Sequence, residues 1–156
     1  MKSAFPALGL FIALCLGAEG LGALATFSAV RTWYPTLAKP PWTPPGWLFG
    51  PVWTVLYLAM AVAAWLVWRR AGPGAVGAAL TIFAVQLALN IAWSFLFFGL
   101  RNPVAGLVDI VLLWVAVVAT TVVFWKISPV AGWLLVPYIA WVTFATALNA
   151  AIVRLN

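Results

Sequence analysis

The chain has 156 residues, of which 67% are hydrophobic and only 6% are charged, with a formal net charge of +6 and a mean hydropathy of +1.14. A water-soluble domain is roughly 45–50% apolar and about 25% charged, so this composition excludes one. The length suits a single domain over residues 1–156. With no histidine and one cysteine, an internal disulfide is excluded and a transition-metal site is not expected.

Five apolar segments are each long enough to cross a hydrocarbon layer of about 30 Å, which takes roughly 20 residues. They cover about residues 5–26, 47–68, 76–98, 104–125 and 132–153. Since a spanning strand requires alternation of polar and apolar residues, which is not seen, each segment is expected to be a helix. The sequence therefore predicts an all-α, multi-pass integral membrane protein: a bundle of five transmembrane helices with a Pro/Trp-rich first loop.

All eight Lys and Arg residues fall outside these segments. Charges at the ends of membrane spans normally meet lipid headgroups, so lipid rather than nucleic acid is the expected partner. The positive charges divide evenly between the two sides, which leaves the orientation open. One side has Lys2, Arg69, Arg70 and Lys126, and the other has Arg31, Lys39, Arg101 and Arg154.

The connection between the first two segments is rich in proline, with five prolines among residues 35–45. Prolines at this density exclude a regular helix and favour a stiff, extended path. Trp33, Tyr34 and Trp42 are interleaved with them and suit the headgroup region or the mouth of a cavity.

The third segment has two contrasting faces. Gln86, Asn90 and Ser94 recur every four residues, with Trp93 and Phe97 on the same side. This polar face should look into the protein, because polar groups at membrane depth rarely face lipid.

A stripe of small residues, Ala84, Ala88 and Ala92, lies about 200° around the same helix. Small residues spaced in this way let helices approach closely, so this face is expected to meet another helix.

Two acids interrupt the apolar segments. Asp109 is either a functional group or an acid stabilised by the nearby start of its helix, and both readings stay open. For Glu19 a position at the interface or in a helix contact is favoured.

Eleven tryptophans are more than interface anchoring requires. Trp53 shares a helix face with Tyr57, and Trp141 shares one with Ala145 and Leu148. Together with the polar face of the third segment they form either an aromatic slot or an ordinary core. No pair of nucleophile and base, carboxylate dyad or phosphate-binding glycine loop is present in the sequence.

The stretch Trp33-Tyr34-x6-Pro41-Trp42-x-Pro44-Pro45-Gly46-Trp47-x5-Trp53-Thr54-x2-Tyr57 resembles the TspO/MBR family, the tryptophan-rich sensory proteins of bacteria and their translocator relatives. Gln86-Leu87-x2-Asn90-x2-Trp93-Ser94, then Val108-Asp109, then Pro137-Tyr138-x2-Trp141 agree with it. The resemblance covers all five segments in order.

The resemblance implies a five-helix bundle in a bacterial cell membrane, often dimeric, that binds protoporphyrin IX and isoquinoline-type ligands in a sensing, trafficking or transport role. Porphyrin would be a ligand rather than a cofactor. Combined with the helix faces, it predicts a ligand site formed by Tyr34, Trp42, Trp53, Tyr57, Asn90, Trp93, Ser94, Phe97, Asp109, Trp141, Ala145 and Leu148.

Two further expectations concern charge and assembly. Arg31 and Lys39 flank the aromatic loop and are expected to meet the porphyrin propionates. A homodimer is expected, with the alanine stripe of the third segment as its contact.

Two alternatives stay open. Trp53 and Trp141 match tryptophans implicated in light- and oxygen-dependent porphyrin breakdown in relatives, which would make the protein an enzyme. A lipid or sterol carrier is the other, although Ala150 and Ala151 stand where the animal cholesterol motif has aromatic residues.

Overall fold

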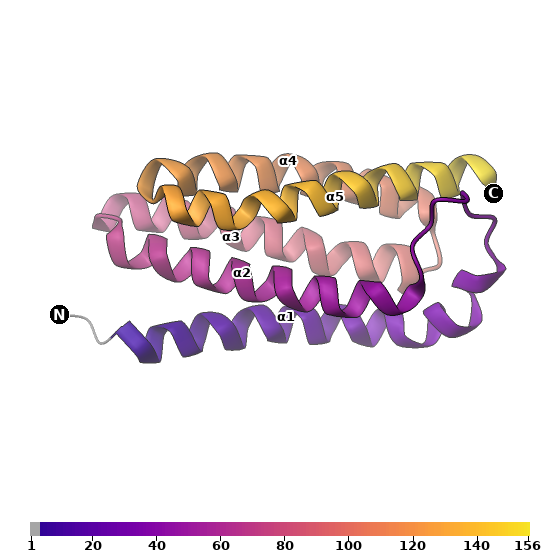
Figure 1. Ribbon diagram of the computed structural model, residues 1–156, viewed down its shortest axis with the longest axis horizontal. Coiled ribbons are helices and arrows are strands. Elements are labelled where there is room, and N and C mark those ends of the chain that lie inside the picture. Colours follow the sequence, from indigo (N-terminus) through magenta and orange to yellow (C-terminus); the bar gives the residue numbers. More distant parts are fainter. Residues whose placement is uncertain (1–3) are drawn as a thin grey trace.

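The structure, a computed structural model, describes residues 4–156. Its long helices lie side by side and run alternately up and down the bundle (Figure 1). They are α1 (Ala4–Thr32), α2 (Phe49–Arg70), α3 (Pro73–Ser94), α4 (Pro103–Ile127) and α5 (Pro129–Leu155). Within the described residues these five helices are long and apolar enough to cross a membrane. The predicted fold is confirmed: the chain is a multi-pass integral membrane protein.

Short helical turns join or extend the long helices: η1 (Tyr34–Thr36), η2 (Gly46–Leu48) and η3 (Phe95–Gly99). The helix α1 continues to Thr32, beyond the predicted end at residue 26, because hydropathy detects the lipid-facing length and not the helix end. The third span changes at Ser94 from an α-helix to the π-helix η3. This change of helix type was not predicted.

The helices α4 and α5 begin before the predicted residues 104 and 132, because caps and prolines define their first turns. Asn102 caps α4 by accepting a hydrogen bond from the Ala105 N–H at 3.0 Å, and Pro103 follows it. Ser128 caps α5 in the same way, with Pro129 after it. Proline suits the first helical position, where its missing N–H is not needed.

The helices form a closed ring in which α1 contacts α2 and α3, α2 contacts α5, and α4 contacts α3 and α5. Consecutive helices are not always neighbours, since α2 and α3 share few contacts although only residues 71 and 72 separate them. The proline-rich connection between α1 and α2, residues 33–48, is called the prolyl segment. It crosses one end of the bundle and passes beside the C-terminus (Figure 1). The other end of the ring is filled by the hydrophobic core, which includes Met60, Val67, Phe124 and Leu135.

The alanine face of α3 points away from the rest of the chain. Ala84 and Ala88 are exposed and Ala92 is partly exposed. The helix expected to cover this face is therefore not one of the described helices of the same chain.

The positive charges lie at both ends of the ring. Arg69, Arg70 and Lys126 belong to the end away from the prolyl segment. Lys2, the fourth charge predicted on that side, lies outside the described residues. The near balance of charge leaves the orientation in the membrane open.

The turn between α4 and α5 provides a test of packing. A Cβ atom at Gly132 would lie 2.9 Å from Cβ of Trp125 and 2.8 Å from its Cδ2, whereas one at Gly77 would meet nothing within 4 Å. Gly132→Ala should lower the free energy of unfolding by about 1–3 kcal/mol through overpacking. Gly77→Ala, an exposed helical position, should raise it by roughly 0.5–1 kcal/mol. Thermal unfolding of both variants in detergent would check this, and equal shifts would contradict the packing around Gly132.

Candidate functional site

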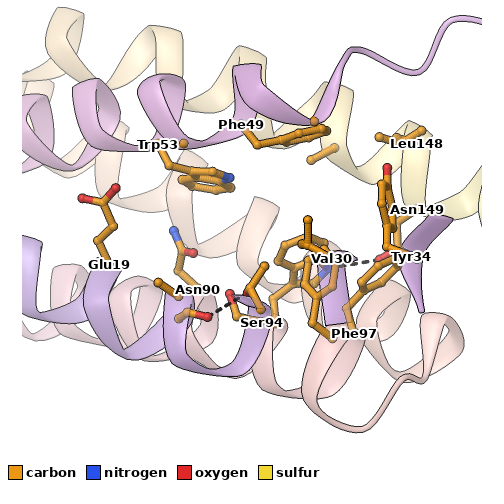
Figure 2. Close-up of a pocket in the computed structure, with 18 of the residues that line it drawn as sticks. Glu19, Val30, Tyr34, Phe49, Trp53, Asn90, Ser94, Phe97, Leu148 and Asn149 are labelled. Atoms are coloured by element: carbon orange, nitrogen blue, oxygen red, sulfur yellow. Dashed lines mark hydrogen bonds between the residues drawn. The ribbon is translucent and has the colours of Figure 1, made fainter. Parts of the chain in front are cut away.

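A cavity of about 210 Å³ lies inside the ring, toward the end that the prolyl segment crosses. Its walls come from α1, α2, α3, η3 and α5, with Tyr34 of η1 and Gly46 of η2 also contributing. No residue of α4 lines it. Figure 2 shows Trp53 and Phe49 on one side, Asn90, Ser94 and Phe97 facing them, and Leu148 and Asn149 on a third side.

Most of the predicted site residues meet at this cavity. Those that line it are Tyr34, Trp53, Tyr57, Asn90, Trp93, Ser94, Phe97, Trp141, Ala145 and Leu148. The structure thus brings together side chains from positions 34 to 148, while their role in binding a ligand stays a prediction.

Two predicted site residues lie elsewhere. Trp42 is 48% exposed and packs its ring against Phe144, with ring centroids 5.7 Å apart. Asp109 is buried on α4, the helix that contributes nothing to the cavity wall. Neither of them lines this cavity, and their part in binding a ligand stays a prediction.

The sequence reasoning missed the face that α1 turns toward the cavity. It consists of Glu19, Gly22, Ala23, Thr26 and Val30. These residues stand at positions i, i+3, i+4, i+7 and i+11, which share one face of a helix, so the pattern was present in the sequence. It went unnoticed because small residues and one acid do not form a hydrophobic stripe.

Further lining residues were missed beside predicted ones. On α2 and its entry these are Gly46, Phe49 and Gly50, on η3 Phe98, and on α5 Asn149 and Ile152. Each of them except Gly46, which lies in η2 before α2, neighbours a predicted residue in the sequence or lies one helical turn from it.

One wall of the cavity is a cluster of aromatic rings from α2 and α5. The rings of Trp53 and Trp141 are perpendicular, with centroids 6.4 Å apart, and Trp53 also packs on Tyr57 at 5.9 Å. Phe49 meets the edge of Trp141 at 5.7 Å. Edge-to-face contacts of this kind stabilise the rings in fixed positions.

The opposite wall depends on the π-helix at the end of α3. Trp93 and Phe97, four residues apart, stack with centroids 5.2 Å apart and 23° between their planes. The wider turn of η3 also buries the next residue, Phe98, whose ring lies 4.8 Å from that of Phe97. Single π-turns inside helices are frequent at functional sites. Here the π-turn adds a third ring to the wall.

A hydrogen-bonded chain of side chains fixes this wall to α4 and α5. The Trp93 Nε1–H donates to Oδ1 of Asn149 at 3.0 Å, and Nδ2 of Asn149 donates to the carbonyl oxygen of Pro103 at 2.8 Å. Gly106 allows this contact, because a Cβ there would lie 3.0 Å from Phe97 Cβ and 3.2 Å from Asn149 Oδ1.

A second buried network lies behind the cavity. Asn90 Nδ2 donates to the Tyr138 hydroxyl at 2.6 Å, and that hydroxyl donates to Gln86 Oε1 at 2.8 Å. Each of the three side chains is at most 2% exposed. Unpaired polar groups are costly at membrane depth, so this network holds α3 and α5 in one register.

Glu19 makes the helix contact that was one of its two predicted roles. It lies near the middle of α1 and lines the cavity, and its Oε1 accepts a hydrogen bond from Thr54 Oγ1 of α2 at 2.6 Å. The predicted helix contact exists, but the side chain is also part of the cavity wall.

The end of the cavity beside Tyr34 and Gly46, here called its mouth, is crossed by the prolyl segment. Lys39 Nζ donates to the carbonyl oxygens of Tyr34 and Leu37, both at 2.9 Å, and lies 4.9 Å from the centre of the Tyr34 ring. The Asn156 side chain accepts from the Ala38 N–H at 3.0 Å and donates to the Ala38 carbonyl oxygen at 2.9 Å. Burial raises the pKa of the Tyr34 phenol, which favours its neutral form at the mouth.

The second loop charge, Arg31, is exposed at the end of α1, and its guanidinium lies 4.2 Å from the centre of the Phe27 ring. Neither Arg31 nor Lys39 lines the cavity. Arg31 lies in the last turn of α1, and Lys39 lies in the prolyl segment.

Two buried polar atoms have no hydrogen-bond partner among the described residues, Trp141 Nε1 and Asp109 Oδ2. The indole of Trp141 is part of the cavity wall, so its N–H is a donor without an acceptor beside a space for a ligand. Such an atom normally gains a partner from water or a ligand.

The fold and the cavity define a class: a helical multi-pass membrane protein with an aromatic, largely apolar cavity between its helices. Residues 11–155 match the model of the TspO/MBR family, and the chain belongs to that family. It is 46% identical to the tryptophan-rich protein TspO of Chlorobaculum tepidum over 96% of this chain and 95% of the relative. The human translocator protein is 42% identical over 97% and 90%. The tryptophan-rich sensory protein of Cereibacter sphaeroides is 40% identical over 94% and 89%.

Proposed function

We propose that this protein binds a flat, hydrophobic ring ligand of the porphyrin or isoquinoline type in the cavity, in a sensing, trafficking or transport role. The observation that carries the proposal is the enclosure of one cavity by Trp53, Trp93, Trp141, Phe49 and Phe97. Ligand pockets are typically apolar and aromatic with a few placed polar groups, here Asn90, Ser94 and the unpartnered indole N–H of Trp141.

Binding a porphyrin requires the cavity to widen. Its volume of about 210 Å³ is below the roughly 300–1,000 Å³ typical of ligand pockets. The wall on α1 consists mainly of small side chains, and the prolyl segment crosses one end of the cavity. We expect these parts to move outward on binding.

A second candidate function rests on the perpendicular pair of Trp53 and Trp141 at the cavity wall. Two tryptophans in contact with a bound porphyrin would be placed to relay electrons while light and dioxygen, the oxidant, break down the ring. The Soret band of bound porphyrin separates the two functions. A steady band in light indicates binding, and a product spectrum that forms faster than from free porphyrin indicates an enzyme.

We further propose that the chain is a homodimer through the exposed face of α3. Ala84 and Ala88 present small side chains to lipid in the single chain, and close packing of two such faces is a common helix contact in membranes.

The first prediction concerns the aromatic wall. Trp53→Phe and Trp141→Phe should each weaken protoporphyrin binding by about 0.5–1.5 kcal/mol through lost ring stacking. Trp68→Phe serves as the control, because Trp68 packs on Phe11 away from the cavity. Titrations followed by the shift of the Soret band would check this. Equal affinities for all three variants would contradict the assignment of the wall.

The second prediction concerns the charges at the mouth. Arg31→Gln should weaken protoporphyrin binding a few-fold, since an exposed ion pair contributes roughly 0–1 kcal/mol, and should flatten the salt dependence. An uncharged isoquinoline-type ligand should bind as before.

Lys39→Gln should weaken the binding of both protoporphyrin and the isoquinoline-type ligand, because Lys39 also donates hydrogen bonds to carbonyl oxygens of the prolyl segment. Equal losses for both ligands in Arg31→Gln would show that Arg31 does not act through charge.

The third prediction concerns the dimer. Ala88→Leu should separate the α3 faces and shift the protein toward monomer in detergent. Ala147→Leu, an exposed alanine on α5, is the matched control and should leave the oligomeric state unchanged. Size-exclusion chromatography with light scattering measures both, and an unchanged dimer in Ala88→Leu would exclude this face.

A further inference from the structure

Among the described residues that line the cavity, Glu19 is the one with an ionisable acid or base of the Asp, Glu, Lys or Arg type. It is near the middle of α1 (Ala4–Thr32), roughly 20 Å from each end of the helix. An ionisable side chain at this depth is costly and by default marks a functional site. A role limited to helix packing would not require a carboxyl group, because a neutral side chain also pairs with a threonine.

The carboxyl group is held in place by α2. Thr54 Oγ1 donates to Glu19 Oε1 at 2.6 Å, and Thr54 Oγ1 also lies 3.1 Å from the Gly50 carbonyl oxygen. Glu19 Oε2 makes no hydrogen bond with another described residue, so this oxygen can accept a hydrogen bond from a ligand. Figure 2 shows Glu19 at the same end of the cavity as Trp53, away from Tyr34 and Leu148.

No basic side chain of the described chain serves as its counter-ion. Arg31, the basic residue of α1, is twelve positions further along, roughly 18 Å away along the helix axis. Lys39 donates to two carbonyl oxygens of the prolyl segment instead. The negative charge that Glu19 can carry is therefore without a protein partner in the cavity.

We propose that Glu19, positioned by Thr54, is the recognition group for a positively charged nitrogen on a flat aromatic ligand. This inference rests on the proposed function, because it assigns the ligand chemistry of the same cavity. In a medium of low dielectric constant a carboxylate attracts a cation far more strongly than in water. The neighbouring faces of Trp53 and Tyr57 add attraction for a cation through their ring quadrupoles.

The experiment compares two flat probes of nearly the same shape at neutral pH, the cationic 9-aminoacridine and the uncharged acridine. Both are titrated against the purified protein in detergent by fluorescence. Glu19→Gln should lower the affinity for 9-aminoacridine about tenfold, as expected for the loss of a charge-assisted hydrogen bond. The same variant should leave the affinity for acridine unchanged.

Two further variants make the result specific. Thr54→Val should lower the affinity for 9-aminoacridine by a smaller factor than Glu19→Gln does, because it removes the hydrogen bond that orients the carboxyl group. Asp109→Asn removes the other acid, which lies on α4 outside the cavity, and should change neither affinity.

The outcomes separate this inference from the proposed function. Equal losses for both probes in Glu19→Gln, or no loss for either, would overturn the role of Glu19 while protoporphyrin binding by the unaltered protein still stands. The unaltered protein could instead bind the cationic probe through Glu19 but fail to bind protoporphyrin. That result would overturn the porphyrin proposal alone. Binding of none of the three ligands would overturn both.

Discussion

Lipid chains offer no hydrogen-bond partner, so polar side chains inside a membrane must pair with the protein, with bound water or with a ligand, and this constraint shapes how the helices meet. Trp93 pairs with Asn149, Asn90 with Tyr138, and Glu19 with Thr54, and each pair joins two different helices. At least one member of each pair lines the cavity. The bonds that hold α1, α2, α3 and α5 in register are therefore the same bonds that place polar groups around a ligand.

The cavity persists because its aromatic walls are packed and the facing wall on α1 has small side chains. The large rings pack on each other, as Trp93 does on Phe97 and Trp53 on Trp141, and so they do not turn to fill the space. The facing helix α1 contributes Gly22 and Ala23, whose side chains are too small to reach across. At Gly22 the helices approach so closely that a Cβ would lie 3.0 Å from Ser94 Oγ. Close approach beside an unfilled space is how small residues form pockets between membrane helices.

The sequence predicted the five spans and about half of the residues around the cavity because both depend on local patterns. Apolar length identifies a membrane helix, and the four-residue spacing of Gln86, Asn90 and Ser94 identifies an inward face. The π-turn at Phe95–Gly99 was not predictable, since it depends on packing against other helices and has no composition of its own. Asp109 illustrates the same limit: its acidity suggested a site, but the order of helices around the ring places α4 behind the cavity.

The shape of the cavity explains why its polar groups act on different parts of a ligand. Along α1 the lining runs from Glu19 to Val30, roughly 16 Å at the helical rise. A volume of about 210 Å³ along this length makes the cavity narrow, and its lining is mostly aromatic and small apolar side chains. Its inner end has a carboxyl group, and its mouth has the prolyl segment tied down by Lys39 and Asn156. A ligand with unlike ends would therefore enter in one orientation, because only the inner end offers an acid and only the mouth has cations nearby.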